Sequence, residues 1–140
     1  MRAYPAGPGR GWSGRIPACG VFLGMDITLD GKVFQGVSNA ANGQVSGATR
    51  FYYAQSGHLV RARYSGGEIA EGHMLGTMRD DGSMLLVYHH LDIAGELRSG
   101  ICESRPERLP DGRVRIREDW RWTYGGEGAG QSVVEEVQPS

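Results

Sequence analysis

The sequence predicts an all-β protein, an antiparallel up-and-down meander of about eight strands that closes into a barrel. Two observations lead to this fold class. Turn-forming residues recur at short intervals from residue 25 onward, and the segments between them have the length and composition of strands. No segment keeps a period of 3.6 residues over three helical turns, which leaves room for at most a short helical turn near Ser38 to Asn42.

The turns contain glycine, which supplies the positive φ that tight hairpins need. They are Asp30-Gly31, Asn42-Gly43, Ser56-Gly57, Ser65-Gly66-Gly67, Asp80-Asp81-Gly82, Ala94-Gly95, Asp111-Gly112 and Gly125-Gly126. Between them we predict, in order, strands at Val33 to Ser38, Ala48 to Gln55, Leu59 to Tyr64, Ile69 to Met78, Met84 to Leu91, Leu97 to Ser104, Arg113 to Thr123 and Ser132 to Val137.

Short links between sequential strands imply antiparallel neighbours, because a parallel pair needs a crossover of about a dozen residues or more. Eight strands in a row leave two open edges, and pairing of the first strand with the last removes both. We therefore favour a closed barrel. A two-sheet sandwich is the alternative, since alternation of side chains does not distinguish closure from face-to-face packing.

The inward face is clearest in the strand at Arg113 to Thr123. One of its faces carries Val114, Ile116, Glu118, Trp120 and Trp122. The other carries Arg113, Arg115, Arg117, Asp119 and Arg121. Arginine is costly in a core, so we expect the first face to point inward, with one carboxylate among its apolar and aromatic residues.

Other strands differ in how far their pattern predicts the inward face. In Leu59 to Tyr64 the residues Val60, Ala62 and Tyr64 are expected inside. In Met84 to Leu91 either parity fits, and the two adjacent histidines cannot share a face. For the strand at Ile69 to Met78 the sequence does not decide whether the face with His73 or the face with Met74 points inward.

Composition limits the partners. The 140 residues carry 15 basic and 16 acidic side chains, which argues against nucleic acid or a membrane surface as partner. No apolar run has the length of a transmembrane helix or the form of a signal peptide. The two cysteines, Cys19 and Cys102, fall short of a disulfide framework, so a cytoplasmic location is expected.

Residues 1 to 24 differ in composition from the rest, with six glycines, three prolines and no acidic residue. We expect this extension to be disordered or loosely attached to a single barrel domain at residues 25 to 140. An alternative is that translation begins at Met25. The domain alone has 12 basic and 16 acidic residues, a net charge of −4, which further weakens a polyanion-binding interpretation.

Glu118 is the first candidate for a catalytic residue. Burial raises the pKa of a carboxyl group and suits it to acid–base chemistry, with His73 or His90 as a proton shuttle. The alternative is a structural network with a Tyr, His or Arg of a facing strand. The candidate walls of a ligand site are Trp120, Trp122, Tyr64, Tyr88 and His90. Ordinary aromatic core packing is the alternative for these residues.

Other polar groups favour structural roles. The four histidines lack the spacing of metal ligands, so we expect no metal and no cofactor. Cys102 is expected to pack as a small apolar residue. The arginine row, which includes Asp119, favours a solvated face with cross-strand ion pairs over a phosphate site. Tyr124 to Gly130 is interpreted as a flexible hairpin, with a mobile lid as the alternative.

Four stretches resemble a known family: Gly36 to Gly43, Tyr64 to His73, Gly100 to Glu107 and Trp120 to Thr123. Over about residues 32 to 137 the chain resembles a family of small bacterial proteins, many of which carry the label N-acetylglutamate synthase. The resemblance implies an acetyltransferase activity and assigns no catalytic residues.

The sequence leaves three candidate functions. The first is a calycin/lipocalin-like or avidin-like barrel that holds a small, partly apolar ligand in its interior. The second is an isomerase, cyclase or hydrolase that uses Glu118 with a His or Tyr as acid and base. The third is the acetyltransferase that the resemblance implies. A small molecule is the expected partner in each, and a homodimer is left open.

Overall fold

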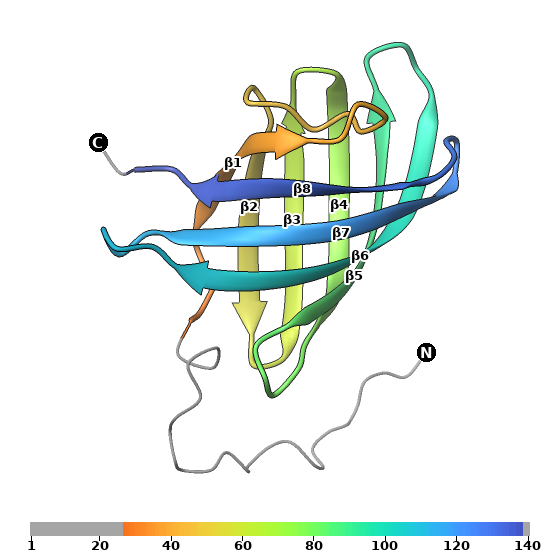
Figure 1. Ribbon diagram of the computed structural model, residues 1–140. Coiled ribbons are helices and arrows are strands. Elements are labelled where there is room, and N and C mark those ends of the chain that lie inside the picture. Colours follow the sequence, from red (N-terminus) through yellow and green to blue (C-terminus); the bar gives the residue numbers. More distant parts are fainter. Residues whose placement is uncertain (1–26, 139–140) are drawn as a thin grey trace.

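The computed structural model describes residues 27–138, which form a closed antiparallel barrel (Figure 1). Each strand pairs with the next in sequence, and the first pairs with the last. The strands are β1 (Val33–Asn39), β2 (Arg50–Ser56), β3 (Leu59–Gly66), β4 (Ile69–Met78), β5 (Met84–Asp92), β6 (Leu97–Arg108), β7 (Val114–Tyr124) and β8 (Ala129–Glu136). The predicted barrel is confirmed and the sandwich alternative is wrong. The extension at residues 1 to 24 lies outside the described residues.

Closure depends on the pairing of β1 with β8. Phe34 lies opposite Glu136 in the register, and the amide of Val137 donates to the carbonyl of Val33 at 2.8 Å. In Figure 1, β6, β7 and β8 cross the front of the barrel, while β2, β3 and β4 run steeply across behind them. Closure removes the two edges that an open sheet of the same strands would have.

The turns form where glycine permits them. Gly57 joins β2 to β3 with a φ of 60°, and Gly95 joins β5 to β6 with a φ of 86°. The segment after β1 forms a turn closed by the Gly43 amide and the Ala40 carbonyl at 3.0 Å, where the sequence left room for at most a short helical turn. The described residues contain no helix, and hence none with the length and apolar character that would let it cross a membrane.

The strand β6 extends further than predicted, to Arg108 instead of Ser104, although it includes Pro106. Ser104 pairs with Met84, the first residue of β5, so beyond this point β6 has only β7 as a neighbour. A strand with one open side tolerates proline, which lacks an amide hydrogen. Sequence reasoning ends the strand too early because it cannot show the register, which pairs Ser104 with the first residue of β5 and leaves the rest of β6 to pair with β7.

The structure resolves the inward faces that the sequence left open. In β5, Tyr88 and His90 are buried and His89 is exposed. In β4 a bulge between Ile69 and Glu71 changes the parity. Ile69 is therefore buried, and so are Gly72, Met74 and Met78 further along the strand.

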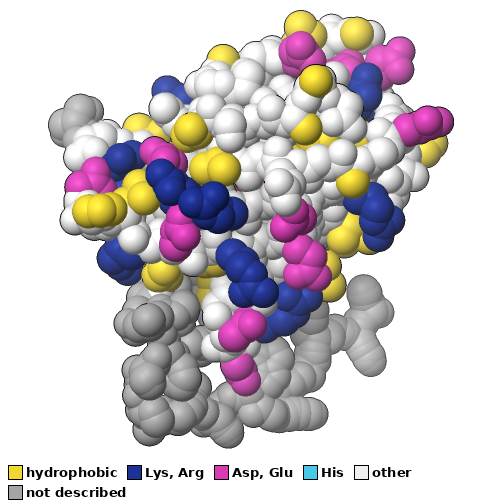
Figure 2. All heavy atoms as spheres, in the orientation of Figure 1, with side chains coloured by type: hydrophobic (Ala, Val, Ile, Leu, Met, Phe, Trp, Pro, Cys, Tyr) yellow, Lys and Arg dark blue, Asp and Glu magenta, His cyan; other side chains and the backbone are white. Residues whose placement is uncertain are grey.

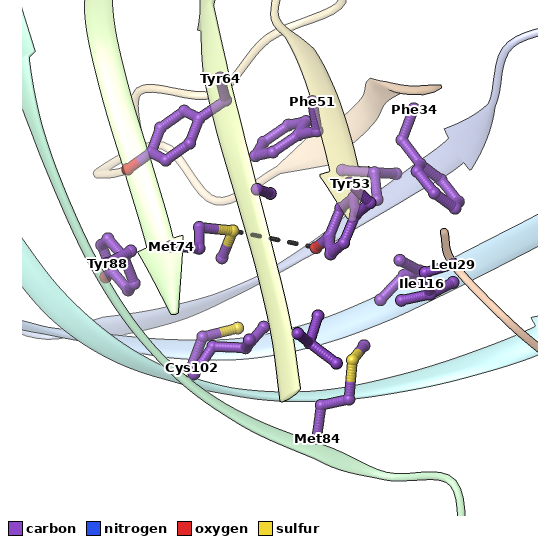
Figure 3. Packing of buried hydrophobic residues seen from close by; sticks show 14 of the residues in the cluster. Leu29, Phe34, Phe51, Tyr53, Tyr64, Met74, Met84, Tyr88, Cys102 and Ile116 are labelled. Carbon is purple, nitrogen blue, oxygen red and sulfur yellow. Dashed lines mark hydrogen bonds between the residues drawn. The ribbon is translucent and has the colours of Figure 1, made fainter. Parts of the chain in front are cut away.

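One part of the interior is filled with apolar side chains. Leu29, from the segment before β1, is fully buried together with Phe34 and Ile116, and Phe34 packs edge-on against Tyr53 at 5.3 Å between ring centroids. These residues lie on one side of the close view, and Tyr64 and Tyr88 lie on the other (Figure 3). This part of the interior is therefore ordinary core, and Tyr64 and Tyr88 belong to a second part.

The outer face of β6, β7 and β8 is charged, with basic and acidic side chains intermingled (Figure 2). Arg115 pairs with Glu135 at 2.9 Å and with Glu107 at 3.4 Å, and Arg117 also pairs with Glu107, at 3.2 Å. The prediction of cross-strand ion pairs on this face is confirmed. Because Arg113, Arg115 and Arg117 are paired with acids, this surface is not organised as a phosphate site.

Candidate functional site

The second part of the interior contains a cavity to which every strand of the barrel contributes. The space open to the centre of a water molecule is about 40 Å³, enough for roughly three waters. Its lining residues are Asn39, Gly43, Gln44, Val45, Phe51, Tyr64, Met74, Tyr88, His90, Cys102, Glu118, Trp120, Trp122 and Ser132. Three of them belong to the β1–β2 loop, residues 40–49, which covers this end of the barrel.

Six of the seven site residues suggested by the sequence line this cavity: Glu118, Trp120, Trp122, Tyr64, Tyr88 and His90. His73 does not. Its ring is 44% exposed on the outside of β4, where it contacts Glu71 at 3.0 Å. The expectation that His73 stands beside Glu118 is wrong, because the bulge in β4 and the alternation after it place Gly72 and Met74 inward and His73 outward.

Glu118 lies in the cavity wall at the centre of β7 and is 6% exposed. Ser132 of β8 donates its hydroxyl to Oε1 at 2.6 Å. The other oxygen, Oε2, is buried and has no hydrogen-bond partner among the described residues. Burial raises the pKa of this carboxyl to about 7, and the Ser132 hydrogen bond opposes the rise. The predicted structural network with a Tyr, His or Arg is replaced by a single serine.

Aromatic rings in contact with one another form a wall of the cavity that Glu118 also lines. Trp122 lies 5.4 Å from Trp120, 5.8 Å from Tyr88 and 5.9 Å from His90, measured between ring centroids. The indole N–H of Trp120 donates to Asn39 Oδ1, and that of Trp122 donates to a carbonyl of the β1–β2 loop, both at 3.2 Å. The indole donors are thus used by the protein itself.

A chain of hydrogen bonds ties the β1–β2 loop to the cavity. The side-chain amide of Gln44 donates to Asp92 Oδ2 at 3.0 Å, and Gln44 Oε1 lies 2.7 Å from His90 Nε2. Since Gln44 Oε1 only accepts, His90 donates from Nε2, and its Nδ1 accepts the hydroxyl of Tyr64 at 2.9 Å. This arrangement fits a neutral imidazole, and burial lowers the pKa of His90 to about 4.

Asp92 anchors this chain at the end of β5. Hydrogen bonds from Gln44 and from the backbone amides of Glu96 and Ala94 lower the pKa of Asp92 to about 2. Arg98 adds an ion pair at 3.3 Å. An ionised Asp92 therefore holds Gln44, and through it the loop, over the cavity across the whole physiological pH range.

Sequence reasoning missed three glycines that shape the cavity. Each lies directly across from an aromatic residue of the preceding strand: Gly72 from Tyr64, Gly100 from Tyr88 and Gly130 from Trp120. A Cβ atom would come within 2.4 Å of the Tyr64 ring at Gly72, and within 2.2 Å of the Tyr88 hydroxyl oxygen at Gly100. The missing side chains let the rings lie flat against the next strand. Two-residue alternation contains no signal for this, because it does not reveal strand register.

Sequence reasoning also missed Asn39, Gln44 and Val45. The available signal is length, since ten residues, 40–49, separate β1 from β2 and a tight hairpin needs far fewer. Cys102, by contrast, behaves as predicted. It is buried against Ser104, and burial raises its pKa well above the ordinary value, which keeps the thiol protonated.

Comparison with known proteins identifies one family. The chain matches the family described as avidin-like protein over residues 27–137, which is the whole described barrel. No curated protein and no solved structure matches the chain. The match does not bear on the N-acetylglutamate synthase label, so acetyltransferase activity stays a prediction. The described residues offer no helix N-terminus to hold the pyrophosphate of acetyl-CoA.

Proposed function

This chain belongs to the avidin-like protein family, and we propose that it binds a small, partly apolar molecule in the cavity beneath the β1–β2 loop. The observation that carries the proposal is the unpartnered Oε2 of Glu118. A buried carboxylate oxygen without a hydrogen bond costs free energy, and here it lies in the wall of a cavity where a ligand can supply the missing donor.

The lining supports a ligand that is apolar over most of its surface. Phe51, Met74 and the two tryptophans provide apolar walls, while Glu118 is the polar group that orients the ligand. The volume suits a compact molecule of a few heavy atoms. A larger one enters when Gln44, which reaches from the loop to His90, is displaced.

The test is a screen of small metabolites and fragments by thermal shift and tryptophan fluorescence. A binder raises the melting temperature, by the equivalent of about 2.7 kcal/mol at one hundred times its Kd, and changes the emission of Trp120 and Trp122. The same binder is expected to lose affinity in Glu118→Gln and to keep it in Leu75→Ala, which changes only the exposed outer face. A broad screen without any stabiliser contradicts the proposal.

A second candidate function is enzymatic, and the pKa of Glu118 favours it. A carboxyl with a pKa of about 7 is close to the ideal for a general acid or base at neutral pH, and Tyr64 and His90 line the same cavity. An isomerase, cyclase or hydrolase acting on the bound molecule fits this chemistry. Glu118→Gln separates the two functions: a loss of kcat at saturating substrate, beyond the loss of affinity, supports the enzyme, and unchanged turnover removes it.

A further inference from the structure

We infer that the molecule bound in the cavity carries a small organic cation, an ammonium or amidinium group, held between the Glu118 carboxylate and the aromatic wall. The inference rests on the proposed binding function and names the chemical class of the ligand. Three features of the lining lead to it: its charge, the state of its hydrogen-bond donors and its rings.

The ionisable side chains of the cavity lining can supply negative charge without a matching positive charge. Its lining contains one carboxylate, Glu118, and neither lysine nor arginine. Burial lowers the pKa of His90 to about 4, so its ring is neutral, and its contacts with Gln44 through Nε2 and with Tyr64 through Nδ1 fit that state. Arg98 pairs with Asp92 outside the lining set. The ionised form of Glu118 therefore has no countercharge in the cavity, and a ligand cation supplies one.

The donors of the lining are already committed to protein acceptors. The hydroxyl of Ser132 donates to Glu118, that of Tyr64 to His90, and that of Tyr88 to the Arg121 carbonyl at 3.3 Å. Both indole N–H groups are used as well. At pH 8, where most of Glu118 is ionised, the unsatisfied group is an acceptor, its Oε2, so the site then suits a ligand that donates.

The rings suit a cation. Positive charge is attracted to the faces of aromatic rings, most strongly to tryptophan. The protein already uses this attraction once, because the Arg98 guanidinium lies over the Trp122 ring at 5.7 Å from its centroid. A ligand cation beside Trp120, Trp122 and Tyr88 is stabilised in the same way, in a cavity whose volume fits a head group of this size.

The test compares pairs of nearly equal shape that differ in charge: acetamidinium with acetamide, and benzamidinium with benzamide. Affinities are measured at pH 8 by tryptophan fluorescence and calorimetry. We expect each amidinium to bind at least about tenfold more tightly than its amide, and the preference to fall to about onefold in Glu118→Gln. The matched control is Asp119→Asn, which removes an exposed acid from the neighbouring position on β7 and is expected to keep the preference.

Proton release gives a second readout. The titratable groups that interact with Glu118 are Tyr53, Tyr64, Tyr88 and Cys102, and burial raises the pKa of each. Burial lowers the pKa of His90, which lines the same cavity, to about 4, so all five groups stay neutral near pH 7. A bound cation keeps Glu118 ionised, so binding at pH 7 releases about half a proton, and binding of the amide releases none. Calorimetry in two buffers of different ionisation enthalpy measures this number.

The outcomes separate the two proposals. Equal or tighter binding of the amides, or an amidinium preference that survives Glu118→Gln, overturns the cationic ligand. If neither pair binds while neutral or anionic compounds from the wider screen do, the proposal of a cationic ligand is wrong and the binding function stands. If no compound binds, whether cationic, neutral or anionic, the proposed binding function itself fails.

Discussion

Glu118 is the residue whose contribution to stability depends most directly on pH. Its pKa in the folded protein is about 7, above the ordinary value of 4.5 for glutamic acid. Between these values the folded protein holds a proton that the unfolded chain has released. The stability associated with the protonated form is therefore complete below pH 4.5 and is lost as the pH rises through 7, by an amount on the order of 3 kcal/mol.

Glu118→Gln removes this dependence, because the amide is neutral at every pH and has the same shape. The free energy of unfolding is measured by urea denaturation for the variant and the wild type. The difference, variant minus wild type, is expected to be larger at pH 8 than at pH 4.5, by on the order of 3 kcal/mol. The pH-dependent contributions of other carboxyl groups, such as Asp92, are the same in both proteins and cancel in the comparison. Asp119→Asn serves as the control for loss of a negative charge on β7. Parallel curves for wild type and Glu118→Gln would contradict the raised pKa of Glu118.

At the residue scale, the sequence predicts the features that depend on alternation along one strand. The inward position of Glu118, Trp120 and Trp122 is predicted correctly because their strand alternates over its whole length. The partner of Glu118 could not be predicted, since Ser132 comes from β8 and only the register across two strands brings it there. The prediction for His73 is wrong for a related reason, because one extra residue at a bulge reverses the parity of the rest of the strand.

At the scale of the strand pair, the cavity depends on an aromatic ring of one strand lying against a glycine of the next. Tyr64 of β3 and Gly72 of β4 make one such pair, and the Tyr64 hydroxyl then reaches His90. The ring also stacks on Phe51, with 5.0 Å between centroids. The position of the ring, and through it the hydrogen bond to His90, depends on the absence of one methyl group.

Gly72→Ala is expected to disturb this arrangement, because its Cβ would lie 2.4 Å from the Tyr64 ring. Displacement of the ring breaks the bond to His90 and costs about 1–3 kcal/mol of unfolding free energy. Ligand affinity is expected to fall with it. The matched control is Gly47→Ala in the β1–β2 loop, where the nearest atom to the new Cβ is 3.7 Å away. Equal stability of the two variants by thermal denaturation would contradict the role of Gly72.

The elements themselves were largely predictable, and their ends were not. Glycine turns divide the chain into the strands that the structure contains, because hairpin geometry is local. In the β1–β2 loop the sequence predicts only a turn around Asn42-Gly43. The covering role of this loop, through Gln44, depends on contacts with β5 that lie 46 residues away in the sequence.

At the scale of the whole molecule, closure brings the two ends of the described barrel together. Val33 and Val137 are joined by a backbone hydrogen bond, so the order of strands around the barrel has no natural starting point. Chain segments join all neighbouring strands except β1 and β8, which pair without a connection. The barrel therefore needs every strand pairing, but it does not need the chain ends to lie between β1 and β8.

A circular permutant tests this. Residues 138 and 27 are joined by a flexible linker, and new ends are opened at the turn of Asp80 to Gly82 between β4 and β5. We expect the permutant to keep the circular dichroism spectrum and a cooperative melting transition. A second permutant opened between Glu118 and Asp119, inside β7, is expected to fail. Similar behaviour of both would show that the closed strand order does not control folding.

The pairing of β1 with β8 also determines when the site exists during synthesis. The ribosome releases β1 long before β8, and until β8 emerges the nascent chain has neither a closed wall nor Ser132 to bond Glu118. Seven strands can assemble in order, but the cavity and its carboxylate are completed together by the last one. A chain that ends before residue 132 therefore exposes two strand edges and lacks the serine that bonds Glu118.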